Sequence, residues 1–249
     1  MRRPCMPGTE RIWRALCLLC ACWLVPCAQA ELRLYAWERP PLVMRDAQGV
    51  ARGLVPELLE AMFARAGLAY TVEFLPLQRA LRQVQQDPQA RSCVVLVERQ
   101  QEREARFLWV GPLLISRLAL YARADDALQL ASLPQAKAWS ILSHQGSGAG
   151  EYLQRMGLQV HYSNHEALNI GMLRHQRARL WATSRAVAEQ GAGGLALREV
   201  LPFLTLMEDL ACHPHLPDEQ LQALRQALQA LYVEGQVQAL YRRHGVALH

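Results

Sequence analysis

Residues 98–123, ERQQEREARFLWVGPLLISRLALYAR, place a dense polar cluster directly before a long apolar run. The preceding residues 92–97, SCVVLV, form the continuous apolar run that is typical of a strand buried on both faces. The polar cluster therefore follows the carboxyl end of a strand, which is the edge where open α/β sheets bind ligands. A second β-type run, residues 118–121, follows Gly111-Pro112 and predicts that the chain crosses into another sheet. We interpret residues 98–123 as a crossover between two lobes.

Residues 1–30 have the features of a secretory signal peptide. Four arginines precede an uncharged run, residues 15–25, and an A-x-A cleavage site ends at Ala30. The run is shorter than the roughly 20 residues that a membrane-spanning helix needs. We therefore expect secretion and cleavage after Ala30. A lipid anchor on Cys27 is the alternative, and Pro26 disfavours it.

The predicted mature chain carries little net charge. Without residues 1–30, the 27 basic and 22 acidic residues of the whole chain fall to 23 and 21. The arginines are scattered among acids and Lys137 is the single lysine, so the sequence has no basic stripe for nucleic acid. The remaining length suits one large domain or two small lobes.

The first part of the mature chain alternates between strand and helix periodicity. A strand, a helix that Gly67 ends, and a second strand follow one another at the spacing of a βαβ unit, so parallel neighbouring strands are expected. The predicted elements are a strand over 31–37, a helix over 54–66, a strand over 70–74, a helix over about 77–86 and a strand over 92–97.

Charged and aromatic residues follow the carboxyl ends of these strands. Trp37 and Glu38 come after the first strand, Arg79 lies in the first turn of the helix after the second, and Glu98 ends the third. An aromatic ring with charges of both signs at one sheet edge predicts a site for a polar ligand. For any one of these residues alone, a solvated loop residue is the favoured interpretation.

A glycine-rich loop, residues 144–150 (HQGSGAG), separates a strand predicted over 139–143 from a helix predicted over 151–156. Such a loop places free backbone N–H groups and the positive end of the helix dipole together, which favours anions. It lacks the Lys-Ser/Thr of a P-loop and the spacing of GxGxxG, so a nucleotide site is not expected. A simple flexible turn is the alternative.

The rest of the chain repeats this alternation. The further predicted elements are a strand near 159–162, a helix over about 165–174, a strand over 178–183 that leads to Ser184, a return strand over 206–212 and a helical tail over 217–244.

Three motifs, taken in order, resemble those of a known family. They are Glu102-Arg103 before Trp109-Val110-Gly111-Pro112, then Gly146-Ser147-Gly148 at a helix start, then Val233-Glu234-Gly235 late in the closing helix. In this respect the mature chain is similar to the periplasmic solute-binding proteins of the polar amino-acid type, which are the family 3 substrate-binding proteins of ABC transporters.

The resemblance implies an α/β fold with two lobes, each a mainly parallel sheet flanked by helices, that close on a ligand as a type II clamshell. Lobe 1 would comprise residues 31–115 and 206–249, and lobe 2 residues 116–205. The protein would be a periplasmic monomer that captures a small polar solute, an amino acid or related carboxylate, and delivers it to an ABC-type inner-membrane permease.

The resemblance also implies ligand-binding roles. Arg103 would hold a ligand carboxylate, for which its planar fork of donors is suited, unless it forms a surface ion pair with Glu102 or Glu104. The family's threonine before this arginine is replaced by Gln100, and the aspartate that binds the ligand's ammonium group is absent near Ser184. The expected ligand-binding residues are Trp37, Glu38, Arg79, Glu98, Arg103, His144, Ser147, Gly148 and Ser184.

Cys93 and Cys212 are the two cysteines that remain after the signal peptide. In the resembled fold, the returning strand lies antiparallel to the strand of Cys93, so the two residues would face each other and form a disulfide. Two independent buried thiols are the alternative.

Two other functions compete with transport. A sensory module would use the same clamshell and deliver its closed form to a membrane receptor. A periplasmic hydrolase would need a nucleophile, and Ser147 lacks the G-x-S-x-G spacing of one. The run Cys212-His213-Pro214-His215 is more typical of a turn than of a metal site, and we expect neither a metal nor a cofactor.

Overall fold

The computed structural model describes residues 31–191 and 193–246. The predicted signal peptide, its cleavage after Ala30 and the alternative anchor at Cys27 lie outside this part of the chain. Among the described helices, none combines the length and apolar character needed to cross a membrane.

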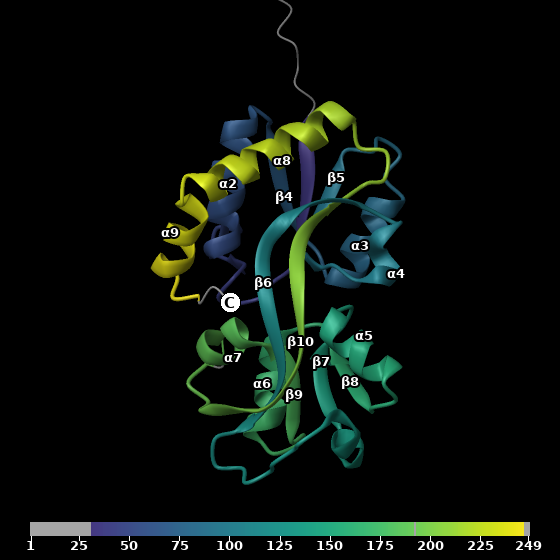
Figure 1. Ribbon diagram of the computed structural model, residues 1–249, viewed down its shortest axis with the longest axis vertical. Coiled ribbons are helices and arrows are strands. Elements are labelled where there is room, and N and C mark those ends of the chain that lie inside the picture. Colours follow the sequence, from purple (N-terminus) through teal and green to yellow (C-terminus); the bar gives the residue numbers. More distant parts are fainter. Residues whose placement is uncertain (1–30, 192, 247–249) are drawn as a thin grey trace, which may run out of the picture. The chain divides into compact units, whose positions relative to one another are not determined.

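One eight-stranded sheet organises the described chain in the order β4-β1-β5-β10-β6-β9-β7-β8 (Figure 1). In the first half-sheet, β1 pairs in parallel with β4 and β5, and in the second, β7 pairs in parallel with β8 and β9. The strands are β1 (Leu32–Ala36), β4 (Tyr70–Phe74), β5 (Ser92–Glu98), β6 (Leu108–Arg123), β7 (Ile141–His144), β8 (Val160–Ser163), β9 (Leu180–Ser184) and β10 (Leu197–Cys212). The predicted parallel βαβ arrangement is confirmed.

Two 16-residue strands, β6 and β10, run antiparallel from one half-sheet to the other (Figure 1). The prediction that the chain enters a separate sheet after Gly111-Pro112 is wrong, because β6 continues through this pair and both half-sheets belong to one sheet. Gly111 permits the continuity. A Cβ at this position would lie 2.1 Å from Oδ1 of Asp209 on β10. The glycine therefore lets the two long strands pass closely.

Helices cover both faces of the first half-sheet. The predicted apolar stripe of α2 (Leu54–Ala66) is buried, and Gly67 ends this helix in the left-handed conformation at φ 66°. The helices α8 (Asp218–Val233) and α9 (Gln236–Arg243) pack beside α2 (Figure 1). On the other face, α3 (Leu77–Gln85) packs against β5 through Leu77, Ala80, Leu81 and Val84. Burial of each large aliphatic side chain stabilises this core by about 1.5–3 kcal/mol.

The second half-sheet carries α5 (Gly148–Arg155), α6 (Glu166–Arg174) and α7 (Arg185–Gly191), together with the short 3-10 helix η2 (Leu133–Ala138). The helix α5 begins three residues before the predicted start, because Ser147 caps it by accepting a 3.1 Å hydrogen bond from the backbone N–H of Gly150. The strand β10 also begins earlier than predicted, and neither α7 nor the small hairpin of β2 (Met44–Arg45) and β3 (Ala51–Arg52) was predicted.

Cys93 and Cys212 form a disulfide, so the predicted pairing is confirmed. They face each other where β10 pairs antiparallel with β5. Both side chains are buried in the core that α2 and α8 cover. The bond joins the end of the returning strand to the start of β5, a separation of 119 residues along the chain.

Candidate ligand-binding site

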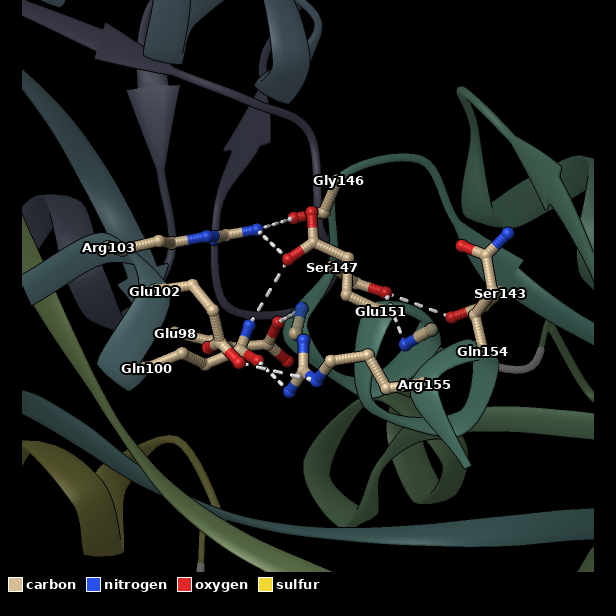
Figure 2. A network of polar contacts seen from close by, with 12 residues as sticks. Glu98, Gln100, Glu102, Arg103, Ser143, Gly146, Ser147, Glu151, Gln154 and Arg155 are labelled. Atoms are coloured by element: carbon tan, nitrogen blue, oxygen red, sulfur yellow. Dashed lines mark hydrogen bonds and ion pairs between the residues drawn. The ribbon is translucent and has the colours of Figure 1, made fainter. Parts of the chain in front are cut away.

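Arg103 connects the two half-sheets (Figure 2). It lies on the short helix α4 (Gln101–Glu104), and only 6% of it is exposed. Its Nη2 donates hydrogen bonds of 2.7 Å to the backbone oxygen of Gly146 and to Oε2 of Glu151 on α5. Its ion-pair partner is therefore Glu151, since the neighbouring Glu102 and Glu104 pair with other arginines.

The N-terminus of α5 meets an acid from the first half-sheet (Figure 2). The backbone N–H of Gly148 donates to Oε2 of Glu98 at the carboxyl end of β5. A Cβ on Gly148 would lie 2.5 Å from Nε2 of Gln100 and 2.9 Å from the Glu98 carboxylate, so a larger residue here would displace these two side chains. The helix dipole and the free N–H groups favour a carboxylate here. The predicted anion-binding loop thus contacts a carboxylate of the chain itself.

A β-bulge in β5 directs Glu98 into this position. Val94 pairs with Ala211 and Val97 pairs with Asp209, so two residues of β5 lie opposite Leu210 alone. One of the two, Leu96, has φ 58°, a left-handed conformation that costs a non-glycine residue about 1–3 kcal/mol. The bulge inverts the alternation of side chains along the strand, because Val95 and Leu96 both enter the core under α2. Such local strain is concentrated at functional sites.

Past the bulge, Glu98 directly faces Glu208 of β10. Glu98 is 4% exposed and Glu208 fully buried, and like charges that face each other across a strand pair are destabilising. Arg39, which follows β1 and is 3% exposed, forms an ion pair with Glu208. Burial and the charge of Glu208 raise the pKa of Glu98 to about 7, although Arg39 and Arg103 oppose the rise. Burial disfavours the charged form of Arg39, but the surrounding glutamates outweigh it and raise its pKa.

The second half-sheet contributes two further buried titratable groups. Glu166, at the start of α6, is 6% exposed and accepts a 3.1 Å hydrogen bond from Nδ2 of Asn169. Burial raises the pKa of Glu166, the Glu98 charge adds to the rise, and Arg39 opposes it. Burial, followed by the charges of Arg39 and His165, lowers the pKa of His144 to about 4. His144 is therefore a neutral imidazole at physiological pH.

Trp37 and His144 pack together across the boundary between the half-sheets, with ring centroids 4.6 Å apart. The indole Nε1 of Trp37 donates a 3.2 Å hydrogen bond to the backbone oxygen of Val95 on β5, which fixes the ring. Both residues line a cleft of about 80 Å³, which Glu38 and His165 also border. The volume of the cleft corresponds to only a few water molecules.

Of the predicted site residues, Trp37, Glu98, Arg103, His144, Ser147 and Gly148 lie where the two half-sheets meet. Glu38 lies at the mouth of the small cleft and pairs with Arg45 at 3.3 Å. Ser184 is 1% exposed at the end of β9. Arg79 is exposed on α3, away from these contacts.

The structure adds four residues to the site that were not predicted from the sequence: Arg39, Glu151, Glu166 and Glu208. One signal could have found Glu208. Glu208 and Asp209 are two charges in the predicted return strand 206–212, whose other residues are apolar, and burial of such charges requires partners. Periodicity gave no such signal for Glu166, because a glutamate in the first turn of a helix is normally solvated.

Several buried polar atoms of this site have no hydrogen-bond partner within the described chain. They are Nε of Arg39, Nη1 of Arg103, both ring nitrogens of His144 and Oε1 of Glu208. A buried polar atom without a partner costs about 1–3 kcal/mol. Their concentration here gives a polar solute both donors and acceptors to satisfy.

No protein-family model and no curated protein matches the sequence. Solved structures do match. An ancestral arginine-binding protein bound to arginine has a TM-score of 0.75 at 17% identity and covers 86% of this chain and 97% of its own. An amino acid ABC transporter substrate-binding protein, AbpA from Streptococcus pneumoniae bound to L-arginine, has a TM-score of 0.75 at 16% identity over 86% and 94%. The chain has the two-lobed fold of the periplasmic binding proteins.

A histidine kinase sensor domain with similarity to periplasmic binding proteins matches equally well, with a TM-score of 0.75 at 16% identity over 87% of this chain and 96% of its own. These likenesses confirm the predicted α/β fold class and the resemblance, at the level of the fold, to polar amino-acid solute-binding proteins. The matched structures include both a transport protein and a sensor domain.

Proposed function

We propose that the protein is a periplasmic solute-binding protein that captures a small polar solute, an amino acid or related carboxylate, between two lobes. Lobe 1 comprises residues 31–115 and 206–249, and lobe 2 comprises residues 116–205. The long strands β6 and β10 connect them and act as the hinge. The solute passes to an ABC-type inner-membrane permease, and the binding protein works as a monomer.

The observation that carries this proposal is the contact of Arg103 with Gly146 and Glu151, together with that of Glu98 with Gly148. In each contact, one group lies on the lobe 1 side and the other at the N-terminus of α5. Opening about the hinge would break both contacts at once. It would release a bidentate guanidinium and a helix N-terminus, which are two strong carboxylate binders. A solute carboxylate would then replace the chain's own carboxylates when the lobes close.

Each of the proposed binding residues has a distinct role. Arg103 anchors the solute carboxylate from lobe 1, and the backbone N–H of Gly148 and the hydroxyl of Ser147 donate from lobe 2. Trp37 supplies an apolar wall, and the neutral His144 beside it offers one donor and one acceptor. Ser184 adds a hydroxyl from the end of β9, and Glu38 borders the opening.

A sensory role is the second candidate, because a histidine kinase sensor domain matches the fold as well as the transport proteins do. In that case the closed form would contact a membrane receptor. Deletion of the gene separates the two functions. Growth on the identified solute falls if the protein serves transport, whereas only the response to the solute is lost if it serves sensing.

We do not propose an enzyme. The hydroxyl of Ser147 caps α5 and lies 2.9 Å from Oγ of Ser143, so it is committed to the helix start. Cys212 is in a disulfide, and Nδ1 of His213 accepts a hydrogen bond from the backbone N–H of His215. These contacts support binding rather than a nucleophile or a metal centre at either motif.

A thermal-shift screen tests the proposed function. The mature protein would be screened with the common amino acids, small peptides, organic acids and polyamines, since a solute that binds only the folded state raises its melting temperature with concentration. At least one compound should give a saturable shift that calorimetry confirms at one site per chain. A screen without any saturable shift would contradict the proposal.

A further inference from the structure

A second pocket, of about 530 Å³, lies beside the first half-sheet. It shares no lining residue with the small cleft that Trp37 and His144 border. Its lining includes one residue from each of three neighbouring strands, which are Ala36 of β1, Val72 of β4 and Val95 of β5. Small-molecule sites in proteins typically have volumes of about 300–1,000 Å³, so this pocket is large enough for one, whereas the small cleft is not.

The hairpin of β2 and β3 lines one side of this pocket, and α2 lines another. The hairpin leaves the space open, because a Cβ on Gly49 would meet no atom within 4 Å. Asp46 fixes the hairpin, since its carboxylate accepts hydrogen bonds of 2.8 Å from the backbone N–H of Val50 and of 2.9 Å from Nε of Arg52. The pocket therefore has a preformed wall, as is usual for small-molecule sites.

The interior of the pocket is apolar. Val43 and Leu59 line it together with the three strand residues. Val50, at the hairpin, lines it as well and is 47% exposed, although the valine has no polar group to solvate. An apolar group that covered these side chains would remove apolar surface from water, which favours binding.

Three charged side chains border the pocket, and two of them have partners. Arg52 pairs with Asp46, and Glu57 pairs with two residues at the carboxyl end of α9. Glu60, about one turn further along α2, forms no ion pair and no side-chain hydrogen bond within the described chain. Burial and then the charge of Glu60 raise the pKa of Tyr70, which also lines the pocket.

The ring of Tyr70 is held in place by Phe63, with ring centroids 4.4 Å apart. The edge of the pocket thus combines a fixed aromatic ring with a carboxylate that has no cationic partner in the described chain. Both groups attract cations, the ring through its quadrupole and the carboxylate through its charge. This observation is independent of the volume and of the apolar interior, and it indicates the charge of the ligand.

We infer that this pocket binds a small organic amine, whose apolar body lies against Val72 and Val95 and whose ammonium group lies beside Glu60 and Tyr70. The inference goes beyond the proposed function, because it adds a second ligand site that uses none of the residues assigned to the site between the lobes.

Three indoles of similar size test the charge of the ligand. Tryptamine carries an ammonium group, tryptophol a neutral hydroxyl and indole-3-acetate a carboxylate, while ethylamine keeps the ammonium group without the apolar body. In calorimetry with the mature protein, tryptamine should bind about threefold or more tighter than tryptophol, and indole-3-acetate more weakly than either. Ethylamine should give no saturable binding in the same range. Equal affinities for the three indoles, or no binding of tryptamine, would overturn the inference.

Two tryptophan variants of β4 then locate the bound tryptamine. Val72→Trp places a large ring in the pocket and should weaken tryptamine binding by about tenfold or more, because the ring occupies the same space. Thr71→Trp adds the same ring to the opposite face of the strand and should bind tryptamine like wild type. Equal affinities for the two variants, with melting temperatures that show folded protein, would place tryptamine elsewhere and refute the assignment.

A pair of charge variants tests the site without changing the packing. Glu60→Gln should weaken tryptamine binding by about two- to fivefold, the range expected for an exposed ion pair, and should leave tryptophol binding unchanged. Glu73→Gln removes an exposed acid that does not line the pocket and should change neither affinity. If Glu60→Gln and Glu73→Gln bind tryptamine equally well, the inferred amine contact is wrong, whether or not Val72→Trp folds.

Discussion

The strands β5 and β10 form one antiparallel pair whose two ends differ in chemistry. At one end, Cys93 faces Cys212 in a disulfide within the apolar core. At the other end, Glu98 faces Glu208, both are buried, and Arg39 forms an ion pair with Glu208. The first end is covalently fixed. The second has like charges that only neighbouring groups or a ligand can balance.

This difference separates stability from function along a single strand pair. The disulfide fixes the returning strand without contacting the site. The glutamate end instead has a strained backbone at Leu96, buried polar atoms without hydrogen-bond partners and a raised pKa at Glu98. Strain and unsatisfied polar groups persist where the surrounding structure is stable enough to hold them. The stability of the disulfide end thus allows the glutamate end to keep unsatisfied polar groups that a ligand can bind.

Removing the disulfide should give the largest loss of stability. The double variant Cys93→Ala/Cys212→Ala frees a loop of 119 residues, and chain entropy predicts a decrease of about 4–5 kcal/mol in the free energy of unfolding. Urea denaturation of the oxidised mature protein and the variant measures it. Solute affinity should stay the same, because the bond is remote from the site. A loss of affinity with unchanged stability would reverse the roles of the two ends.

Removing the cation at the other end should cost slightly less. Arg39→Met leaves Glu208 buried without its partner and should lower the free energy of unfolding at pH 8 by about 3–5 kcal/mol. Arg45→Met, at a partly exposed arginine in the hairpin, should change it by about 0.5 kcal/mol or less. The double variant Arg39→Met/Glu208→Met should regain most of the loss, since a buried ion pair can be replaced by apolar side chains. Equal losses for the single and double variants would contradict the ion-pair account.

Titration of Glu98 should produce a smaller, pH-dependent effect. Its pKa is about 7 in the folded protein and about 4.5 in the unfolded chain, so the folded state favours the protonated form. Its stabilising contribution is complete below pH 4.5 and is lost as the pH rises through 7. Relative to wild type, Glu98→Gln should therefore gain stability between pH 5 and pH 8, by on the order of 1–3 kcal/mol.

Denaturation of Glu98→Gln and of wild type between pH 5 and pH 8 separates the effect of Glu98 on stability from the effect of His144. The lowered pKa of His144 has the opposite sign, since its contribution is lost as the pH falls from 6.5 to about 4, and it is common to both proteins. A difference between Glu98→Gln and wild type that does not change with pH would show that Glu98 titrates normally.

The fold could be predicted largely from the sequence because its signals are local. The buried strand 92–97, the helix 54–66 that Gly67 ends and the facing cysteines follow from periodicity, turn chemistry and the resemblance. The separate second sheet was a wrong prediction because Gly111-Pro112 normally interrupts a strand. In β6 the strand continues through Gly111 because the side chain of Asp209, which is distant in sequence, leaves no room for a Cβ at this position.

The site was predicted in part. Arg103 and the Gly146-Ser147-Gly148 loop could be proposed from the motif order, but their partner acids could not. The bulge at Leu96 sets the direction of Glu98, and the pairing register sets Glu208 opposite it, and neither is encoded in a local pattern. Arg39 and Glu166 become functional candidates only through burial, which depends on how the half-sheets meet.

The central claim, that a solute carboxylate binds Arg103 between the lobes, is tested most directly by isothermal titration calorimetry with the solute from the screen. Arg103→Ala should weaken binding by about thirtyfold or more, or about 2 kcal/mol, because the carboxylate loses a charge-assisted contact in a buried site. Arg106→Ala removes an exposed arginine three residues away and should bind like wild type. An affinity for Arg103→Ala equal to that of Arg106→Ala and wild type would contradict the account.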